Sequence, residues 1–303
     1  MNKNYKRNDT LDETQNRYSD TELLHTHPYD PALLETVRND FLKPRTCRQF
    51  LDWLDSHPHY DVVAEASSQY LRGTRREDCF WQCAQIDADW NTINKNIKTY
   101  VEKKNLDTEF ETDYTEEWRI SHMDKQKDHV PFRHNSELDN QHKHGFNKQY
   151  QLIEVTLSDA FPEIMEIEKL FQFHWAKTDI NYQPTSGQFP RHVDFLTTGF
   201  KRAVEFDRSI ANTPYDPITK SPVGWRLVRI LIPADGWHPG QMFSFEEHSW
   251  SNWAPGQVID FSWAHCRHAT ANSGYSPRPL IKITGLIKDD HWLAKKQFRK
   301  FTI

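Results

Sequence analysis

From about residue 173 onward, proline and glycine divide the sequence into short apolar or alternating runs, and this pattern restricts the fold more than any other feature. Runs of this kind are typical of β-strands, whose side chains alternate between two faces. Several short strands at this spacing indicate an antiparallel sandwich or a jelly-roll barrel. The expected strands are Phe173–Ile180, Gln188–Phe195, Trp225–Ile232, Gln241–Phe245, Gln257–Trp263 and Leu280–Ile287.

Three earlier segments have the period of an amphipathic helix instead. They are residues 46–55, with Thr46 as N-cap, residues 88–102, and residues 158–171, with Ser158 as N-cap. Because the helices precede the strands, we expect an α+β fold in which N-terminal helices pack on the outside of a jelly-roll barrel.

These patterns divide the chain into four regions, which we expect to form one structural domain. They are a polar extension at 1–45, a helical support region at 46–172, a jelly-roll core at 173–288 and a C-terminal tail at 289–303. Residues 121–150 are rich in histidine but have neither regular spacing nor an apolar frame. We expect them to form a solvated loop.

The overall charge and hydropathy restrict the partners of the chain. The net charge is −5, which argues against a nucleic-acid partner. The N-terminal residues lack the apolar segment of a secretory signal, and no apolar run reaches the roughly 18 residues of a membrane span. We therefore expect a soluble, cytoplasmic protein without a membrane partner, and the sequence does not indicate its oligomeric state.

His192 and Asp194 lie two residues apart in one expected strand, so the imidazole and the carboxylate face the same side of the sheet. That spacing alone is common by chance. His268, after the run Gln257–Trp263, would add a second imidazole from a neighbouring strand. Two histidines and one carboxylate form the facial triad of non-haem iron(II) sites, which leaves other coordination positions open. We predict a metal site at these three residues.

Arg278 begins the last expected strand, ten residues after His268. A guanidinium inside a barrel binds a carboxylate through two parallel hydrogen bonds. His265 and His248 are rivals of His268 as metal ligands, and His248 lies in a polar turn. The residues alone leave this choice open, and His268 is favoured only by the resemblance to a family pattern with ten residues between the distal histidine and the arginine.

The order His192-Val193-Asp194, then His268, then Arg278 resembles the iron(II)/2-oxoglutarate-dependent dioxygenases. The resemblance covers roughly residues 173–288, and the stretch from His268 to Asn272 is similar to the distal motif of the aspartyl/asparaginyl hydroxylase branch. It implies a double-stranded β-helix (cupin-like) core, iron(II) as the metal, and 2-oxoglutarate and O2 as cosubstrates. It also places Arg278 on the remote carboxylate of 2-oxoglutarate.

The sequence departs from the family at one position. Where the family often carries a serine two residues after the arginine to help hold 2-oxoglutarate, this chain has Leu280. Tyr182 and Thr284 are candidates for a replacement hydroxyl, and Asn181 and Tyr182 are candidate pocket residues on the strand before His192. Asp194 argues against the halogenating branch, whose members carry a small residue there.

The resemblance implies a hydroxylase that couples substrate oxidation to the decarboxylation of 2-oxoglutarate to succinate and CO2. The segment between Asp194 and Trp225 is expected to form a loop over the site, and its Lys201, Arg202 and Arg208 suit a polar or acidic substrate. Candidates are a small metabolite, an amino acid or a protein side chain. The alternatives are a non-redox, metal-binding cupin-type enzyme, against which Arg278 argues, and a catalytically silent jelly-roll binding module.

Overall fold

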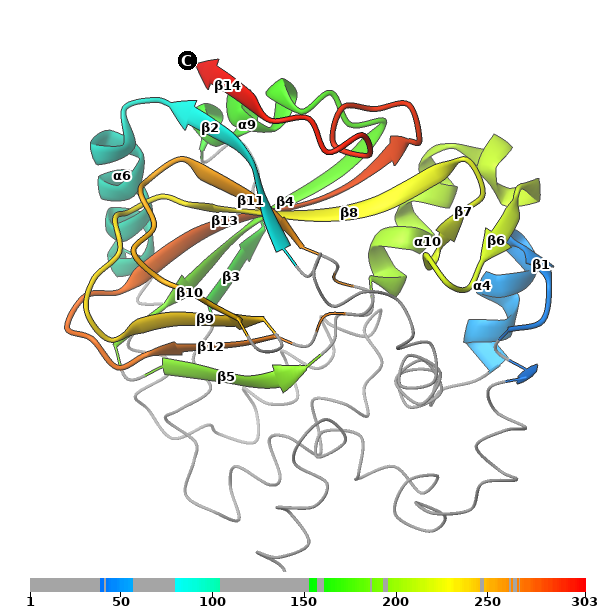
Figure 1. The fold of residues 1–303 in the computed structure, drawn as a ribbon, viewed down its shortest axis with the longest axis horizontal. Helices are drawn as coiled ribbons and strands as arrows, with labels where there is room; N and C mark the ends of the chain where they lie inside the picture. The colour runs from blue at the N-terminus through cyan, green and yellow to red at the C-terminus, as the bar shows by residue number, and fades with distance from the viewer. Residues whose placement is uncertain are drawn as a thin grey trace, which may run out of the picture.

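The computed structural model describes residues 39–40, 42–56, 80–103, 153–156, 161–185, 187–192, 196–245, 248–261, 263, 266 and 268–303. These residues form three sheets and several helices, and the two larger sheets lie face to face (Figure 1). The α+β class predicted from the sequence is confirmed. Within the described residues, every helix is too short or too polar to cross a membrane.

The seven-stranded sheet has the strand order β14-β2-β11-β8-β13-β4-β3. Its strands are antiparallel except β14 and β2, which run parallel. They are β2 (Phe80–Asp87), β3 (Ile153–Thr156), β4 (Trp175–Gln183), β8 (Trp225–Pro233), β11 (Gln257–Phe261), β13 (Arg278–Lys288) and β14 (Arg299–Thr302). The predicted C-terminal tail therefore contributes a strand to this sheet, because β14 pairs with β2.

The four-stranded sheet has the strand order β10-β9-β12-β5. All its neighbours are antiparallel. The strands are β5 (Gly187–His192), β9 (Gln241–Phe245), β10 (His248–Trp250) and β12 (His268–Asn272).

Eight of these strands pair in a nested order that defines a jelly roll. The first, β4, pairs with the last, β13, and β5 pairs with β12. Inside these, β8 pairs with β11 and β9 with β10. This is the arrangement of a long hairpin folded over into two sheets. Within the described residues the two sheets share no strand pairing, so the fold is jelly-roll-like without the closed barrel that the sequence predicted.

Two helices cover the outer face of the seven-stranded sheet, as predicted. They are α6 (Trp90–Lys103) and α9 (Pro162–Leu170). Ile93 and Ile97 of α6 and Ile164 of α9 pack with the outward apolar side chains of β8 and β13. Phe161, not Ser158, precedes α9, because Pro162 with its preset backbone angle begins the helix.

A third helix, α4 (Cys47–Ser56), begins as the sequence predicts. The hydroxyl of Thr46 accepts a hydrogen bond from the backbone N–H of Gln49 at 3.2 Å. The side chain of Gln49 accepts in return from the backbone N–H of Thr46 at 2.9 Å, which completes a capping box.

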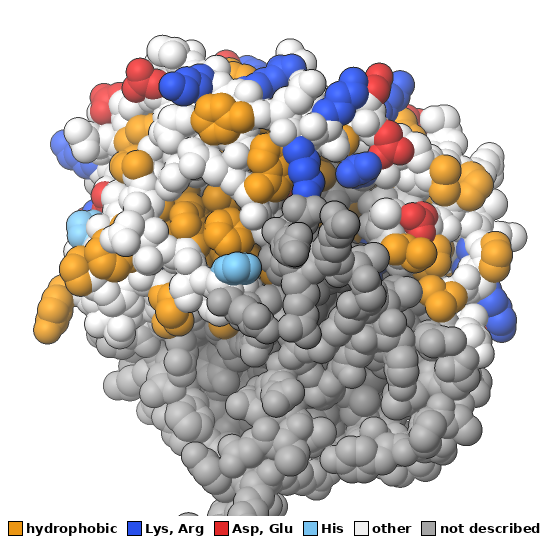
Figure 2. Space-filling view, viewed as in Figure 1, with side chains coloured by type: hydrophobic (Ala, Val, Ile, Leu, Met, Phe, Trp, Pro, Cys, Tyr) orange, Lys and Arg blue, Asp and Glu red, His pale blue; other side chains and the backbone are white. Residues whose placement is uncertain are grey.

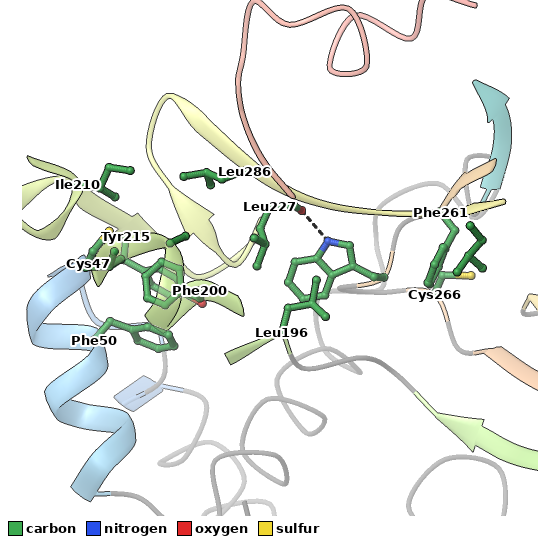
Figure 3. Packing of buried hydrophobic residues seen from close by; sticks show 14 of the residues in the cluster. Cys47, Phe50, Leu196, Phe200, Ile210, Tyr215, Leu227, Phe261, Cys266 and Leu286 are labelled. Carbon is green, nitrogen blue, oxygen red and sulfur yellow. Dashed lines mark hydrogen bonds between the residues drawn. The ribbon is translucent and has the colours of Figure 1, made fainter. Parts of the chain in front are cut away.

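The segment between Asp194 and Trp225, predicted to be a loop, is largely ordered secondary structure. It contains α10 (Thr197–Phe206), the short helix η2 (Arg208–Asn212), β6 (Pro214–Asp216) and β7 (Ser221–Pro222), and β6 pairs with β1 (Arg45–Thr46). Phe50 of α4 stacks on Tyr215 of β6, with ring centroids 3.6 Å apart, and Phe200 of α10 packs against both (Figure 3). The loop prediction failed because α10 alternates charged residues with a narrow apolar stripe.

The side chains of β13 alternate between two different environments. Ile281 and Ile283 join the outer core under α6 and α9. Leu280 and Leu286 join the inner core between the two sheets, where Trp263 donates a hydrogen bond to the carbonyl of Leu227 at 2.6 Å (Figure 3). The even-numbered positions of β13, which include Arg278, therefore belong to the inner face.

Burial raises the pKa of Asp260, at an outward position of β11, to about 7 from 3.8. A hydrogen bond from the indole of Trp81 at 3.3 Å and the charges of Lys296 and Arg226 oppose this shift. The folded state therefore holds the proton more tightly than the unfolded chain. This group stabilises the fold fully below pH 3.8, and its contribution is lost as the pH rises through about 7.

We expect Asp260→Asn to remove this part of the pH dependence. Between about pH 4 and about pH 8, the free energy of unfolding of the unmodified chain should fall relative to that of the variant by on the order of 4 kcal/mol. Urea titrations across this range measure the difference, with Asp289→Asn, an exposed aspartate paired with Arg226, as the control. Parallel curves for Asp260→Asn and the unmodified chain would contradict the assignment.

Candidate metal and carboxylate site

His268 begins β12 and is buried between the two sheets, 4% exposed. Three rings surround its imidazole: Phe243 and Phe245 stack on it, and Phe261 meets it edge-on with centroids 4.9 Å apart. Its Nδ1 lies 3.3 Å from the carbonyl oxygen of Cys266. Since a carbonyl only accepts, the neutral tautomer that makes this bond carries its proton on Nδ1 and its lone pair on Nε2. Metal-binding histidines are oriented in this way.

His192 ends β5 at the position directly opposite His268 in the neighbouring strand. Directly opposed positions of an antiparallel pair lie on one face of the sheet, with Cβ atoms about 5 Å apart. The register therefore brings together the two predicted histidine positions. Asp194 and the rival His265 lie outside the described residues. The other rival, His248, is exposed on β10.

The described residues contain no group of three histidine, cysteine, aspartate or glutamate side chains that could hold a metal. The fit of iron(II) therefore depends on His268 and the position of His192. The lone pair on Nε2 of His268 and the backbone register are both compatible with a shared ion, for which Asp194 is the predicted third ligand.

Arg278 lies at the start of β13 with only 3% of its surface exposed. Its Nη1 donates to the carbonyl of Met242 at 3.1 Å, and its guanidinium lies over the ring of Phe243, 5.2 Å from the centroid. Its Nε is buried and has no hydrogen-bond partner. Burial lowers the pKa of Arg278 to about 9, so the side chain is still charged at neutral pH.

No carboxylate of the described residues lies within ion-pair distance of this guanidinium. A buried charge without a counter-ion costs several kcal/mol, and a bound carboxylate would offset that cost. Because Met242 occupies Nη1, the Nε edge remains for a partner that accepts two hydrogen bonds. Phe243 contacts both Arg278 and His268, so the guanidinium and the imidazole belong to one interior.

The Arg278 end of this interior is closed. Asn272, at the end of β12, donates to the carbonyl of Gln183, at the end of β4, at 3.1 Å. Two loops meet beyond it: a Cβ at Gly240, whose φ is +92°, would lie 2.5 Å from the backbone N of Gly274. That backbone conformation favours glycine. From this end β12 leads back to His268, and the inner face of β4 leads back to Lys177, whose side chain is 23% exposed.

The other residues predicted to bind the cofactor lie at different places relative to Arg278. Asn181 shares the inner face with Arg278, and its buried Oδ1 has no hydrogen-bond partner. Tyr182 points to the outer core under the helices. Thr284 accepts from Nε of Arg229 at 3.2 Å and lies six residues beyond Arg278, about 20 Å along the strand. The structure therefore brings neither hydroxyl to Arg278.

Sequence reasoning missed an ionic cluster on the same inner face. Asp179 of β4 lies opposite Lys282 of β13, and its two oxygens lie 3.0 Å from Nζ of Lys177 and 3.8 Å from Nζ of Lys282. The Asp179 side chain is 2% exposed and that of Lys282 is 9% exposed. Only the register between these distant strands shows that the three charges meet.

Among the described residues on the face seen in Figure 2, Lys and Arg side chains are interspersed with Asp and Glu and form no dominant basic patch. This mixture agrees with the net charge of −5.

Neither a protein-family model nor a curated protein matches this sequence. Similar solved structures include a prolyl-4-hydroxylase from Pseudomonas putida, 12% identical, with 45% of this chain and 66% of that chain covered and a TM-score of 0.28. The 2-oxoglutarate complex of a viral collagen prolyl hydroxylase from Paramecium Bursaria Chlorella virus-1 is 10% identical, with 45% and 79% covered and a TM-score of 0.28. A cupin domain from Bordetella pertussis is 11% identical, with 46% and 96% covered and a TM-score of 0.23. Similarities at these TM-scores carry no argument about function.

Proposed function

We propose that this chain is an iron(II)- and 2-oxoglutarate-dependent oxygenase that hydroxylates a polar or acidic small metabolite, amino acid or protein side chain. The observation that supports this most is the buried guanidinium of Arg278, which has no carboxylate of the described residues within ion-pair distance and lies in the interior that contains His268. A metal-binding jelly roll that does not use a keto acid has no need of such a charge.

In this proposal His192, Asp194 and His268 hold the iron, and Arg278 binds the remote carboxylate of 2-oxoglutarate. The bound iron would supply oxygen activation coupled to decarboxylation of the keto acid to succinate and CO2. The Cys266 carbonyl keeps the imidazole of His268 in one orientation. The rings of Phe243, Phe245 and Phe261 exclude water from its sides.

The substrate would approach from the end opposite Arg278. At the other end of the inner face of β4, the side chain of Lys177 is 23% exposed, whereas Gln183 is 0% exposed. The ionic cluster of Lys177, Asp179 and Lys282 lies on this path and supports a polar or charged substrate. A buried charge cluster inside a cleft is a common feature of functional sites.

Binding and turnover of 2-oxoglutarate by the full chain test the proposal. With iron(II), ascorbate and O2, we expect succinate to be released from 2-oxoglutarate. Calorimetry with Mn(II) in place of iron should give a measurable Kd for 2-oxoglutarate. Metal binding without 2-oxoglutarate binding would favour the non-redox cupin-type enzyme, and absence of both would favour the silent binding module.

Arg278→Leu separates the keto-acid site from the metal site. We expect the variant to bind 2-oxoglutarate at least about 30-fold more weakly, because a buried charged hydrogen-bond donor is lost. Its Mn(II) affinity should stay within about 3-fold, since Arg278 is not one of the proposed metal ligands. Arg226→Leu, which removes a half-exposed arginine paired with Asp289, is the matched control. Equal losses for both ligands would mean that Arg278 is structural.

A further inference from the structure

Gln183 and Arg278 are direct register partners at the closed end of the inner face, and both are buried. Gln183 is 0% exposed, and its Nε2 donates to the hydroxyl of Thr270 at 3.0 Å. Its Oε1 is buried without a partner, as is Nε of Arg278 beside it. Buried polar atoms almost always have partners, so two unpaired atoms on adjacent side chains indicate that something else binds between the sheets here.

The four-stranded sheet places two residues against this pair. Thr270 of β12 and Phe243 of β9 are also direct register partners. Gln183 is hydrogen-bonded to Thr270, and Arg278 lies over the ring of Phe243. The Thr270–Phe243 pair of the four-stranded sheet therefore packs against the Gln183–Arg278 pair of the seven-stranded sheet.

We propose that Gln183 is a second carboxylate-binding and specificity-determining residue of this site. A hydroxyl either accepts or donates a hydrogen bond, so the amide of Gln183 can turn over and keep its bond to Thr270. Its oxygen then accepts from Thr270, and its nitrogen donates to a carboxylate held on the Nε edge of Arg278. The inference rests on the proposed function for the identity of the ligand.

This role follows from what lies around Arg278. Leu280, two positions along β13, is apolar, and neither Tyr182 nor Thr284 comes near the guanidinium. Gln183, directly opposite Arg278 in the register, has a neutral amide. A neutral amide adds a donor without a counter-charge, so Arg278 stays available to a ligand.

Three substitutions test the role of Gln183, each measured by calorimetric binding of 2-oxoglutarate in the presence of Mn(II). We expect Gln183→Leu to weaken 2-oxoglutarate binding about 10-fold, the effect of one hydrogen bond to a charged group. Gln183→Glu should weaken it about 100-fold or more, because a fixed carboxylate would pair with Arg278 and repel the ligand. Gln257→Leu, on β11 beside Gln82, is the matched control and should have no effect.

Two further measurements distinguish this role from a structural one. Mn(II) affinity should be unchanged in both Gln183 variants, whereas a general distortion of the site would lower it together with 2-oxoglutarate affinity. Thr270→Val should weaken 2-oxoglutarate binding, and Thr270→Ser, which keeps the hydroxyl, should restore it. Glutarate, which shares the remote carboxylate but lacks the keto acid, should show the same ranking of variants.

The outcomes separate the two proposals. If the unmodified chain binds 2-oxoglutarate and Gln183→Leu binds it equally well, the role of Gln183 is overturned and the oxygenase proposal stands. If the unmodified chain binds neither 2-oxoglutarate nor glutarate, the oxygenase proposal fails, and the role of Gln183 fails with it.

Discussion

Replacing His268 by alanine is expected to lower the affinity of the chain for iron(II) by more than about 100-fold, since changes merely adjacent to metal ligands already cost about 10- to 100-fold. His268 is the one described side chain of the predicted triad, and its Nδ1 bond to Cys266 directs the Nε2 lone pair away from that carbonyl. Anaerobic titration with iron(II), or with Co(II) followed by its absorbance, measures the change.

His248→Ala provides the matched control, because His248 is exposed on β10 and lies opposite Phe245 in the register. We expect its metal affinity to equal that of the unmodified chain. His268→Gln keeps most of the buried volume if the alanine variant loses stability. Unaltered iron(II) affinity in a folded His268 variant would refute the metal site.

Asp179→Ala is expected to destabilise the fold by about 3–5 kcal/mol, the usual cost of leaving a buried charge without its partner. Lys282 would lose the carboxylate of Asp179 in a place where its side chain is only 9% exposed. Lys177 is 23% exposed and can turn toward water, so most of the effect should come from Lys282. Guanidinium titration at neutral pH measures the loss.

The double variant Asp179→Leu with Lys282→Met separates charge from packing. Because it removes both buried charges and keeps apolar volume, it should recover most of the stability lost in Asp179→Ala. A loss below about 1 kcal/mol for Asp179→Ala would mean that the cluster is well solvated. A double variant less stable than Asp179→Ala would show that the charges themselves stabilise the fold.

The strands of the jelly roll could be predicted where their sequences are apolar and clearly bounded. The run Gln241–Phe245 matches β9 at both ends, and Trp225–Ile232 ends one residue before β8 does. Of the strands that the sequence did not predict, two show the physical reason most clearly. β12 is short and rich in alanine, with weak strand propensity, and β2 mixes glutamine with aromatic residues and has no bounding glycine or proline.

The candidate site was predictable only in part. His192, His268 and Arg278 follow from order and spacing, and the structure places the first two in register and the third in the same interior. Gln183 and Asp179 were not predictable, because the register of β4 with β13 determines which residues they face. The register between two strands that are distant in the sequence is not a local property of the sequence.

The nested pairing has a consequence for how the molecule is made. β13 lies between β4 and β8 in the centre of the larger sheet, yet it is the last of the eight jelly-roll strands to leave the ribosome. Until it arrives, β4 and β8 have no shared neighbour, and closing so long a stretch of chain is intrinsically slow. The two strands that carry Gln183 and Arg278 therefore pair only after all the other jelly-roll strands have been synthesised.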